Sequence, residues 1–247
     1  MKGGDSILQA VILAAGKGTR MKSDLPKVLH RIGGSPLLEH VLAAVRGAAV
    51  DRIVVVVGHQ AALVKRTCGA DDLEFVLQEP QQGTGHAVQV AVPALLSGGH
   101  TVVLAGDVPL LRAGTIRRLV DETVTAGASA SVLTCRVADA GAYGRIIRDA
   151  DGNLARIVEA RDATAAELAV GEYNTGVFCY RTADMCEALA RLSADNDQGE
   201  YYLTDTIAHL VSAGKPVQTV AITDPDEVVG INTVAELKAA DDLLRAR

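Results

Sequence analysis

The sequence predicts an α/β fold built on a doubly wound, mostly parallel sheet. Short apolar runs alternate with helix-length amphipathic segments from the start of the chain. The runs are continuous in Val, Ile and Leu, as in IVVVV at 53–57, which is typical of strands that a parallel sheet buries on both faces. At 247 residues the chain is long enough for a sizeable core, because a chain of this size buries roughly 70–75% of its unfolded surface.

The elements of the first half, about 1–127, alternate regularly between strand and helix. Its predicted strands are 8–14 (LQAVILA), 51–58 (DRIVVVVG), 73–78 (LEFVLQ) and 100–107 (HTVVLAGD). Its predicted helices are 36–48 (PLLEHVLAAVRGA) and 87–97 (AVQVAVPALLS). This alternation predicts crossover connections and therefore parallel neighbours in the sheet.

The second half, about 128–230, changes to mixed strands. The dipeptide Asp151-Gly152 joins two alternating segments within 143–163 and predicts a hairpin. Further elements are predicted as strands at 128–137, 172–180 and 216–222, and as helices at 199–214 and 233–247. We find no low-complexity linker and no internal repeat. We therefore expect one domain over 1–247, with a mixed-strand second lobe forming the wall against which a second substrate lies.

Composition limits the partners of this chain. The net charge of −6 and the aromatic content of 3% argue against nucleic acid and anionic membranes as ligands. No apolar run approaches the roughly 18 residues of a membrane span, and MKGGDSI contains no signal region. The four cysteines show no CxxC spacing, so we expect buried thiols in a reducing cytoplasm rather than zinc ligands or disulfides.

The loop that follows the first predicted strand carries glycines and basic side chains. It reads LAAGKGTRM at 13–21, where Gly16 and Gly18 let the backbone approach an anion closely. A Walker A loop is excluded because Gly18 follows Lys17, and a dinucleotide fingerprint is excluded because its third glycine would fall on Met21. Two interpretations remain open from these residues alone: a phosphate-binding loop, and a tight turn within a solvated basic segment.

Two polar side chains end predicted strands at the carboxyl edge of the sheet. Gln78 offers a donor and an acceptor that match the O4/N3–H edge of uracil, and a buried amide bonded to backbone is the alternative. Asp107 is a natural Mg²⁺ ligand, because that ion takes one or two protein oxygens together with phosphate oxygens. Its alternative is an N-cap for the helix that starts near Arg112.

The motifs taken together are far more specific than any one of them. In order they are AAGKGTRM, LPK, QQGTGHA, AGDVPL, YGRI, VEARDA, NTG and QGEYYLTD. In this order the chain resembles the sugar-nucleotide pyrophosphorylases over about Leu8 to Asn232. It is most similar to the N-acetylglucosamine-1-phosphate uridylyltransferase domain of bifunctional bacterial enzymes that make UDP-N-acetylglucosamine. The resemblance implies a Rossmann-like, GT-A-like nucleotide-diphospho-sugar transferase fold.

The resemblance also implies a role for individual residues in the first half, its nucleotide-binding half. Arg20 would lie near the β- and γ-phosphates of UTP, and Lys27 against the α-phosphate or the sugar phosphate, so that Arg20, Lys27 and Asp107 carry catalysis. The implied nucleotide-binding residues are Leu13, Ala14, Ala15, Gly16, Gly18, Gln78, Gly83 and Thr84.

Sugar and metal sites are implied in the same way. Gly144, Glu159 and Asn174 would hold the sugar, and Asp107 with Asn232 would bind Mg²⁺. The residue before Gly106 is Ala105, where the bifunctional enzymes commonly carry Tyr, so one wall of the sugar pocket is altered.

The implied reaction converts UTP and N-acetylglucosamine 1-phosphate into UDP-N-acetylglucosamine and pyrophosphate. A phosphate with a second pKa of about 6 is largely dianionic at neutral pH, so the attack needs no general base. A pyrophosphorylase for another sugar phosphate or nucleotide, and a catalytically silent regulatory protein, are the alternatives. The resemblance is also compatible with a homo-oligomer of this chain. The sequence has no hexapeptide repeats, so we expect no acetyltransferase β-helix domain in this chain.

Overall fold

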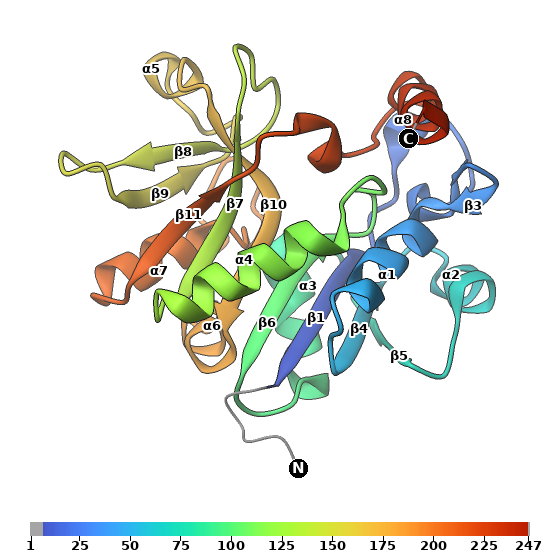
Figure 1. Ribbon diagram of the computed structural model, residues 1–247, viewed down its shortest axis with the longest axis horizontal. Helices are drawn as coiled ribbons and strands as arrows, with labels where there is room; N and C mark the ends of the chain where they lie inside the picture. Colours follow the sequence, from blue (N-terminus) through green and yellow to red (C-terminus); the bar gives the residue numbers. More distant parts are fainter. Residues whose placement is uncertain (1–6, 247) are drawn as a thin grey trace.

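The computed structural model describes residues 7–246, which form a nine-stranded sheet flanked by helices (Figure 1). Seven strands follow the order β11-β7-β10-β6-β1-β4-β5, and β8 and β9 extend the sheet beside β10. Their bounds are β1 Leu8–Ala14, β4 Arg52–Val57, β5 Leu73–Leu77, β6 His100–Ala105, β7 Ala130–Arg136, β8 Arg145–Arg148, β9 Leu154–Val158, β10 Glu172–Arg181 and β11 Val217–Ala221. A small second sheet pairs β2 Arg31–Ile32 with β3 Ser35–Pro36.

Helices cover both faces of the sheet, which confirms the doubly wound prediction. One face carries α1 Leu37–Gly47, α2 Ala61–Cys68 and α4 Ala113–Thr125, and the other carries α3 Thr84–Ala91, α6 Thr182–Leu189 and α7 Asp205–Ser212. The strands β6, β1, β4 and β5 are mutually parallel, as their continuous apolar runs predict. Apolar side chains of each helical layer pack on alternate residues of the same strands, so that Ile12 faces one layer and Val11 the other.

The strand β10 runs antiparallel between β6 and β7. Strands of the second half therefore continue the main sheet. The β8–β9 hairpin joins this sheet near the start of β10 and projects away from it (Figure 1). The predicted hairpin at Asp151-Gly152 is confirmed. In its turn the Asp149 carboxylate accepts hydrogen bonds from the backbone N–H groups of Asp151 and Asn153.

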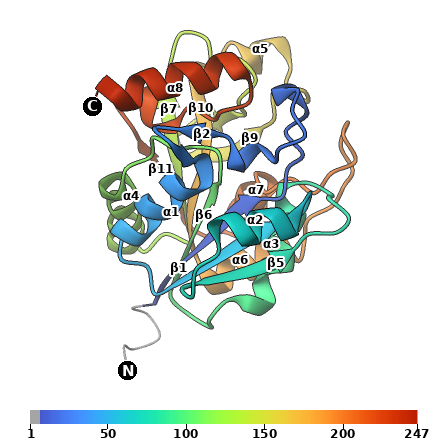
Figure 2. The same ribbon diagram turned by 90° about the vertical axis from the view of Figure 1, so that its right-hand side faces the viewer.

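The helix α8, Val234–Ala246, lies across β2 (Figure 2). Ile32, Leu37 and Ala240 belong to a small apolar cluster between them. The Asp241 carboxylate accepts a hydrogen bond from the backbone N–H of Gly33 at 2.6 Å. The predicted helix 233–247 thus begins one residue later than expected. Its last residue lies outside the described residues, as do residues 1–6 of the segment in which no signal region was predicted.

The predicted helix 199–214 starts later than its sequence pattern indicates. The structure has α7 only from Asp205, because the preceding backbone is engaged elsewhere. The N–H of Tyr201 donates to the carbonyl of Gln82 at 2.9 Å, and the N–H of Gly85 donates to the carbonyl of Tyr201 at 2.7 Å. This pairing places residues 199–204 over the loop that follows β5.

Within residues 7–246, no helix combines the length and the apolar character that a membrane span requires. The cysteines of this part of the chain are free. Cys68, Cys135 and Cys179 are buried, as predicted, whereas Cys186 is only half-buried. Burial raises the pKa of the Cys68 and Cys179 thiols to about 12. These thiols therefore belong to the core.

Candidate active site

The candidate site lies at the carboxyl edge of the parallel strands, where the strand order reverses. From β1 the chain proceeds outward to β4 and β5, and then returns to β6 on the other side of β1. The loops that follow β1 and β6 therefore lie side by side, joined by a hydrogen bond from the Gly106 N–H to the Leu13 carbonyl at 2.9 Å. Such a reversal point is where open α/β sheets bind their ligands.

The loop after β1 turns sharply at Gly18 and brings Lys27 back beside it. Gly18 has φ of +64°, and a Cβ built there would lie 2.6 Å from the Lys27 Cβ. Both the conformation and the contact therefore require glycine. A 3₁₀ turn, Thr19–Met21, follows, in which Met21 is buried. The first long helix, α1, begins only at Leu37, so the groups available to an anion here are loop amides and side chains.

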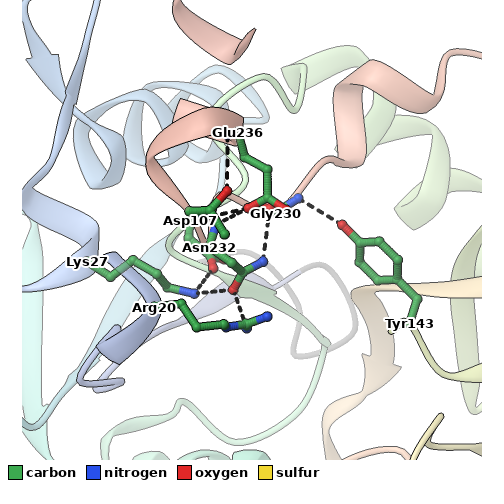
Figure 3. Close-up of polar contacts among 8 residues, drawn as sticks. Arg20, Lys27, Asp107, Tyr143, Gly230, Asn232 and Glu236 are labelled. Atoms are coloured by element: carbon green, nitrogen blue, oxygen red, sulfur yellow. Dashed lines mark hydrogen bonds and ion pairs between the residues drawn. The ribbon is translucent and has the colours of Figure 1, made fainter. Parts of the chain in front are cut away.

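Four predicted site residues from three distant segments meet in one cluster (Figure 3). The Lys27 ammonium forms an ion pair with the Asp107 carboxylate and donates a hydrogen bond to Asn232 Oδ1 at 3.1 Å. Arg20 Nη2 donates to the same Oδ1 at 2.8 Å. The side chains of Lys27 and Asp107 are only 18% and 12% exposed, so this pair is shielded from most solvent.

The segment before α8 holds Asn232 from both sides. Asn232 Nδ2 donates to the Gly230 carbonyl at 3.0 Å, and its backbone N–H donates to the Glu236 carboxylate at 2.7 Å. Glu236 and Thr233 form a capping box, because the Thr233 N–H donates to Glu236 Oε2 and the Glu236 N–H donates to Thr233 Oγ1. This cap fixes both the start of α8 and the position of Asn232.

Asp107 and Asn232 supply the oxygen atoms that could hold a cation. Their side-chain oxygens converge on the Lys27 ammonium, which shows that one positive charge can be shared between them. A carboxylate and an amide oxygen suit Mg²⁺, which retains water and uses phosphate oxygens for its remaining positions. Among residues 7–246, no cluster of three or more His, Cys, Asp or Glu side chains could hold a metal. The alternative role of Asp107, as N-cap of the following helix, is excluded. The N-cap of α4 is Arg112, and no side chain forms a capping hydrogen bond there.

A pocket of about 410 Å³ opens beside this cluster. The predicted residues that line it are Leu13, Ala14, Ala15, Gly16, Lys27, Gln78, Gly83, Thr84 and Asp107. They are joined by Val28, Gln81, Ala87, Ala105 and Glu200. Residues from the loops after β1, β5 and β6 thus enclose one cavity at the edge of the sheet.

Two glutamines organise the loop after β5. Gln78 is buried, and its Nε2 donates to the Gly83 carbonyl at 2.9 Å, so this side chain both lines the pocket and bonds to backbone. Gln81 Nε2 donates to the Ala15 carbonyl at 2.6 Å and so ties this loop to the loop after β1. Gly83 has φ of +102°, and a Cβ there would lie 2.6 Å from the Tyr201 carbonyl oxygen. The close approach of residues 199–204 therefore depends on this glycine.

The three predicted sugar-binding residues lie together in the second lobe. The Asn174 N–H donates to the Gly144 carbonyl at 2.8 Å. An ideal Cβ on Gly144 would lie 3.5 Å from Glu159 Oε2, and Glu159 Oε1 accepts from Thr204 Oγ1 at 2.9 Å. Glu159 lines a second pocket, of about 320 Å³. Because Glu200 lines both pockets, they are neighbours.

Comparison with known families assigns most of the chain to one protein family. Residues 10–212 match the model of the MobA-like NTP transferase domain. This chain belongs to that family. Bifunctional protein GlmU of Acidovorax sp. (strain JS42) is 48% identical over 246 residues, which are 97% of this chain and 51% of that protein. GlmU of Synechococcus sp. (strain RCC307) is 46% identical over 243 residues, 98% of this chain and 53% of that protein.

This NTP transferase domain spans about half the length of the curated relatives it matches. A solved structure of UDP-glucose pyrophosphorylase complexed with UDP-glucose matches it with a TM-score of 0.76 at 17% identity, and the match covers 97% of this chain and 99% of the other. That similarity shows the fold. The Rossmann-like fold is thereby confirmed, and the family match and the GlmU relatives confirm the resemblance to sugar nucleotidyltransferases.

Several groups of this candidate site were not predicted from the sequence. Gln81 lies in the motif QQGTGHA two residues before Gly83, and that adjacency could have indicated it. Glu200 reaches the pocket only because residues 199–204 pair with another loop. Tyr143, next to Gly144, contacts the segment before α8 through its hydroxyl. No local pattern indicates a contact across 87 residues of sequence.

We expect Glu159→Gln to stabilise this NTP transferase domain at neutral pH. Burial, reinforced by the charges of Asp205 and Asp162, raises the pKa of the Glu159 carboxyl, although the hydrogen bond from Thr204 opposes this. A raised pKa in the folded state means that stability falls as the pH rises from the ordinary value, about 4.3, through the raised one. The amide removes that loss and retains the oxygen that accepts from Thr204.

Urea denaturation at several pH values measures this effect. The gain in free energy of unfolding over wild type should shrink as the pH falls toward the ordinary carboxyl pKa, where both side chains are neutral. Glu122→Gln on α4 is the matched control, because that side chain is 47% exposed and its surface ion pair contributes little. A pH-independent difference would contradict the assignment to Glu159.

Proposed function

We propose that this domain is an Mg²⁺-dependent nucleotidyltransferase that makes UDP-N-acetylglucosamine and pyrophosphate from UTP and N-acetylglucosamine 1-phosphate. The observation that carries the proposal is the convergence of Arg20, Lys27 and the oxygens of Asp107 and Asn232 beside a pocket at the strand-order reversal. Membership of an NTP transferase family supports the reaction class. The ordered motifs that resemble N-acetylglucosamine-1-phosphate uridylyltransferases support these particular substrates.

The chemistry requires alignment and charge neutralisation rather than a base. The attacking sugar phosphate is largely dianionic at neutral pH, because its second pKa is about 6. Two anionic phosphates must approach each other in line, and the cationic cluster reduces their repulsion. Arg20 supplies a planar fork suited to two phosphate oxygens, and Lys27 supplies a compact mobile charge. When bound, Mg²⁺ at Asp107 and Asn232 would add further charge stabilisation on the phosphate oxygens.

The arrangement of the two pockets supports separate binding positions for the nucleotide and the sugar. In this proposal the nucleotide occupies the pocket lined by residues 13–16, Gln78 and Gly83. The sugar lies toward Glu159, which lines the second pocket, and toward the adjacent Gly144 and Asn174. The backbone around Gly16 is open, since a Cβ there would meet no atom within 4 Å. Gly16 is also exposed, so a phosphate group can approach the backbone at this position.

Ala105 favours a second candidate, a pyrophosphorylase for a different sugar 1-phosphate or nucleotide. Its methyl group lines the first pocket, at a position where the related bifunctional enzymes commonly carry Tyr. A smaller side chain leaves more room in this pocket beside Asp107, where the two substrates would meet, so a different nucleotide or sugar 1-phosphate could fit. A catalytically silent regulatory protein is disfavoured, because Arg20, Lys27 and Asp107 are all present and face one another.

A pyrophosphate-release screen tests the proposal. Each of the four common nucleoside triphosphates is paired with the 1-phosphates of glucose, N-acetylglucosamine, galactose and mannose, with and without Mg²⁺. We expect the fastest Mg²⁺-dependent release with UTP and N-acetylglucosamine 1-phosphate. Faster release with another pair would support the second candidate, and no release with any pair would contradict both.

A further inference from the structure

The hydroxyl of Tyr143 bridges the second lobe and the segment before α8. Tyr143 lies in the loop between β7 and β8, directly before Gly144. Its hydroxyl oxygen accepts a hydrogen bond from the backbone N–H of Gly230 at 3.0 Å (Figure 3). This is a side-chain contact between the lobe assigned to the sugar and the segment that carries Asn232.

Gly230 links Tyr143 to Asn232 through two hydrogen bonds. Its N–H is held by Tyr143, and its carbonyl accepts from Asn232 Nδ2 at 3.0 Å. The second bond fixes the nitrogen side of the Asn232 amide, as Lys27 and Arg20 fix its oxygen side. Lys27 and Arg20 can only donate hydrogen bonds, and both donate to Asn232 Oδ1. A flipped amide would present Nδ2 to these donors and would remove the oxygen from the cation position.

The ring of Tyr143 is itself held by the second lobe. It packs on the ring of Tyr173, with 4.7 Å between the centroids. Tyr173 is followed by Asn174, whose N–H donates to the Gly144 carbonyl. The element that places the sugar-binding residues therefore also fixes the hydroxyl. Burial raises the pKa of Tyr143, so the group stays a neutral phenol at physiological pH.

We propose that Tyr143 is a positioning residue that holds Gly230 and, through it, orients the Asn232 amide oxygen toward the bound cation. This inference rests on the proposed function, and it adds a residue that touches neither metal nor nucleotide in that scheme. Groups that orient a metal ligand commonly change metal affinity or activity by about 10- to 100-fold when removed. Loss of the Tyr143 hydroxyl should therefore weaken cation binding and leave nucleotide binding unaffected.

Mn²⁺ binding tests the inference without requiring turnover. The apparent Kd for Mn²⁺ is measured by electron paramagnetic resonance on the protein saturated with UTP, with a UTP-only sample subtracted. Tyr143→Phe should raise this Kd by about 10-fold and should raise the Mg²⁺ concentration for half-maximal rate by the same factor. The KM for UTP at saturating Mg²⁺ should not change.

Two further variants separate positioning from a general structural effect. Tyr173→Phe removes a hydroxyl from the other ring of the same stack, and it should bind Mn²⁺ like the wild type. In an Asn232→Ala background, Tyr143→Phe should cause no additional loss of Mn²⁺ affinity, because its effect acts through that amide. Equal Mn²⁺ affinity in wild type and Tyr143→Phe, or an undiminished loss without Asn232, would overturn the inference.

These outcomes differ from a failure of the proposed function. A wild-type protein that releases pyrophosphate with no substrate pair would contradict the function. The Mn²⁺ titration would still report on Tyr143 in that case. Thermal denaturation of each variant checks that Tyr143→Phe and Tyr173→Phe are equally folded.

Discussion

Replacing Lys27 with alanine is expected to lower the rate of pyrophosphate release by roughly 10²-fold or more, because the substitution removes a preorganised charge at the reacting centre. The Lys27 side chain is 18% exposed, and its ammonium contacts both Asp107 and Asn232. A charge in such a shielded position acts more strongly on a phosphate than a charge in water does. Initial rates under saturating UTP and sugar phosphate measure the effect.

Lys22→Ala is the matched control for Lys27→Ala. Lys22 lies in the same loop, five residues away, but its side chain is exposed. Its loss changes the net charge of the protein equally and should leave the rate close to that of the wild type, because screened surface charges contribute little. Equal losses in both variants would show that Lys27 acts only through the general basic character of the loop.

Apolar strand patterns predict where this site lies in the sheet better than they predict the direction of each strand. Asp107 is predictable because it follows a continuous apolar run, and the carboxyl ends of parallel strands share one edge. The antiparallel direction of β10 is not predictable in this way. The second half of this strand, VFCY at 177–180, is as apolar as the parallel strands, since burial on both faces produces the same pattern in either direction.

The contacts that orient the site residues depend on tertiary structure. Arg20 and Lys27 can be assigned from a motif, yet both bond to Asn232, more than 200 residues later in the chain. Tyr143 meets Gly230 only because the second lobe adjoins the segment before α8. Likewise α7 begins late because the backbone of Tyr201 pairs with another loop, which local helix propensity cannot reveal.

The ion pair of Lys27 with Asp107 has a consequence for any cation that binds here. Both groups are largely shielded, and removing one partner leaves the other charge uncompensated at a cost in stability. A divalent cation at Asp107 would take over the role that the ammonium fills in this structure. Lys27 would then be available to a phosphate group in the adjoining pocket, so cation and substrate binding should favour each other.

Asp107→Asn is expected to reduce Mg²⁺-dependent pyrophosphate release by about 10³-fold or more, because a bound cation supplies several kcal/mol of transition-state charge stabilisation. The amide keeps the size of the side chain and an oxygen that can accept from Lys27, so the fold should be preserved. Only the negative charge is lost. Rates measured across a range of Mg²⁺ concentrations should show that excess Mg²⁺ does not restore activity.

Asp24→Asn is the control for this loss of charge. Asp24 is exposed in the loop after β1, so the substitution removes the same charge outside the cluster. Its rate and its Mg²⁺ dependence should match the wild type. Mn²⁺ binding to the UTP complex should be lost in Asp107→Asn and retained in Asp24→Asn. If Asp107→Asn turned over at a near-normal rate, the carboxylate would be an ion-pair partner of Lys27 and nothing more, and the cation would have to bind through other groups.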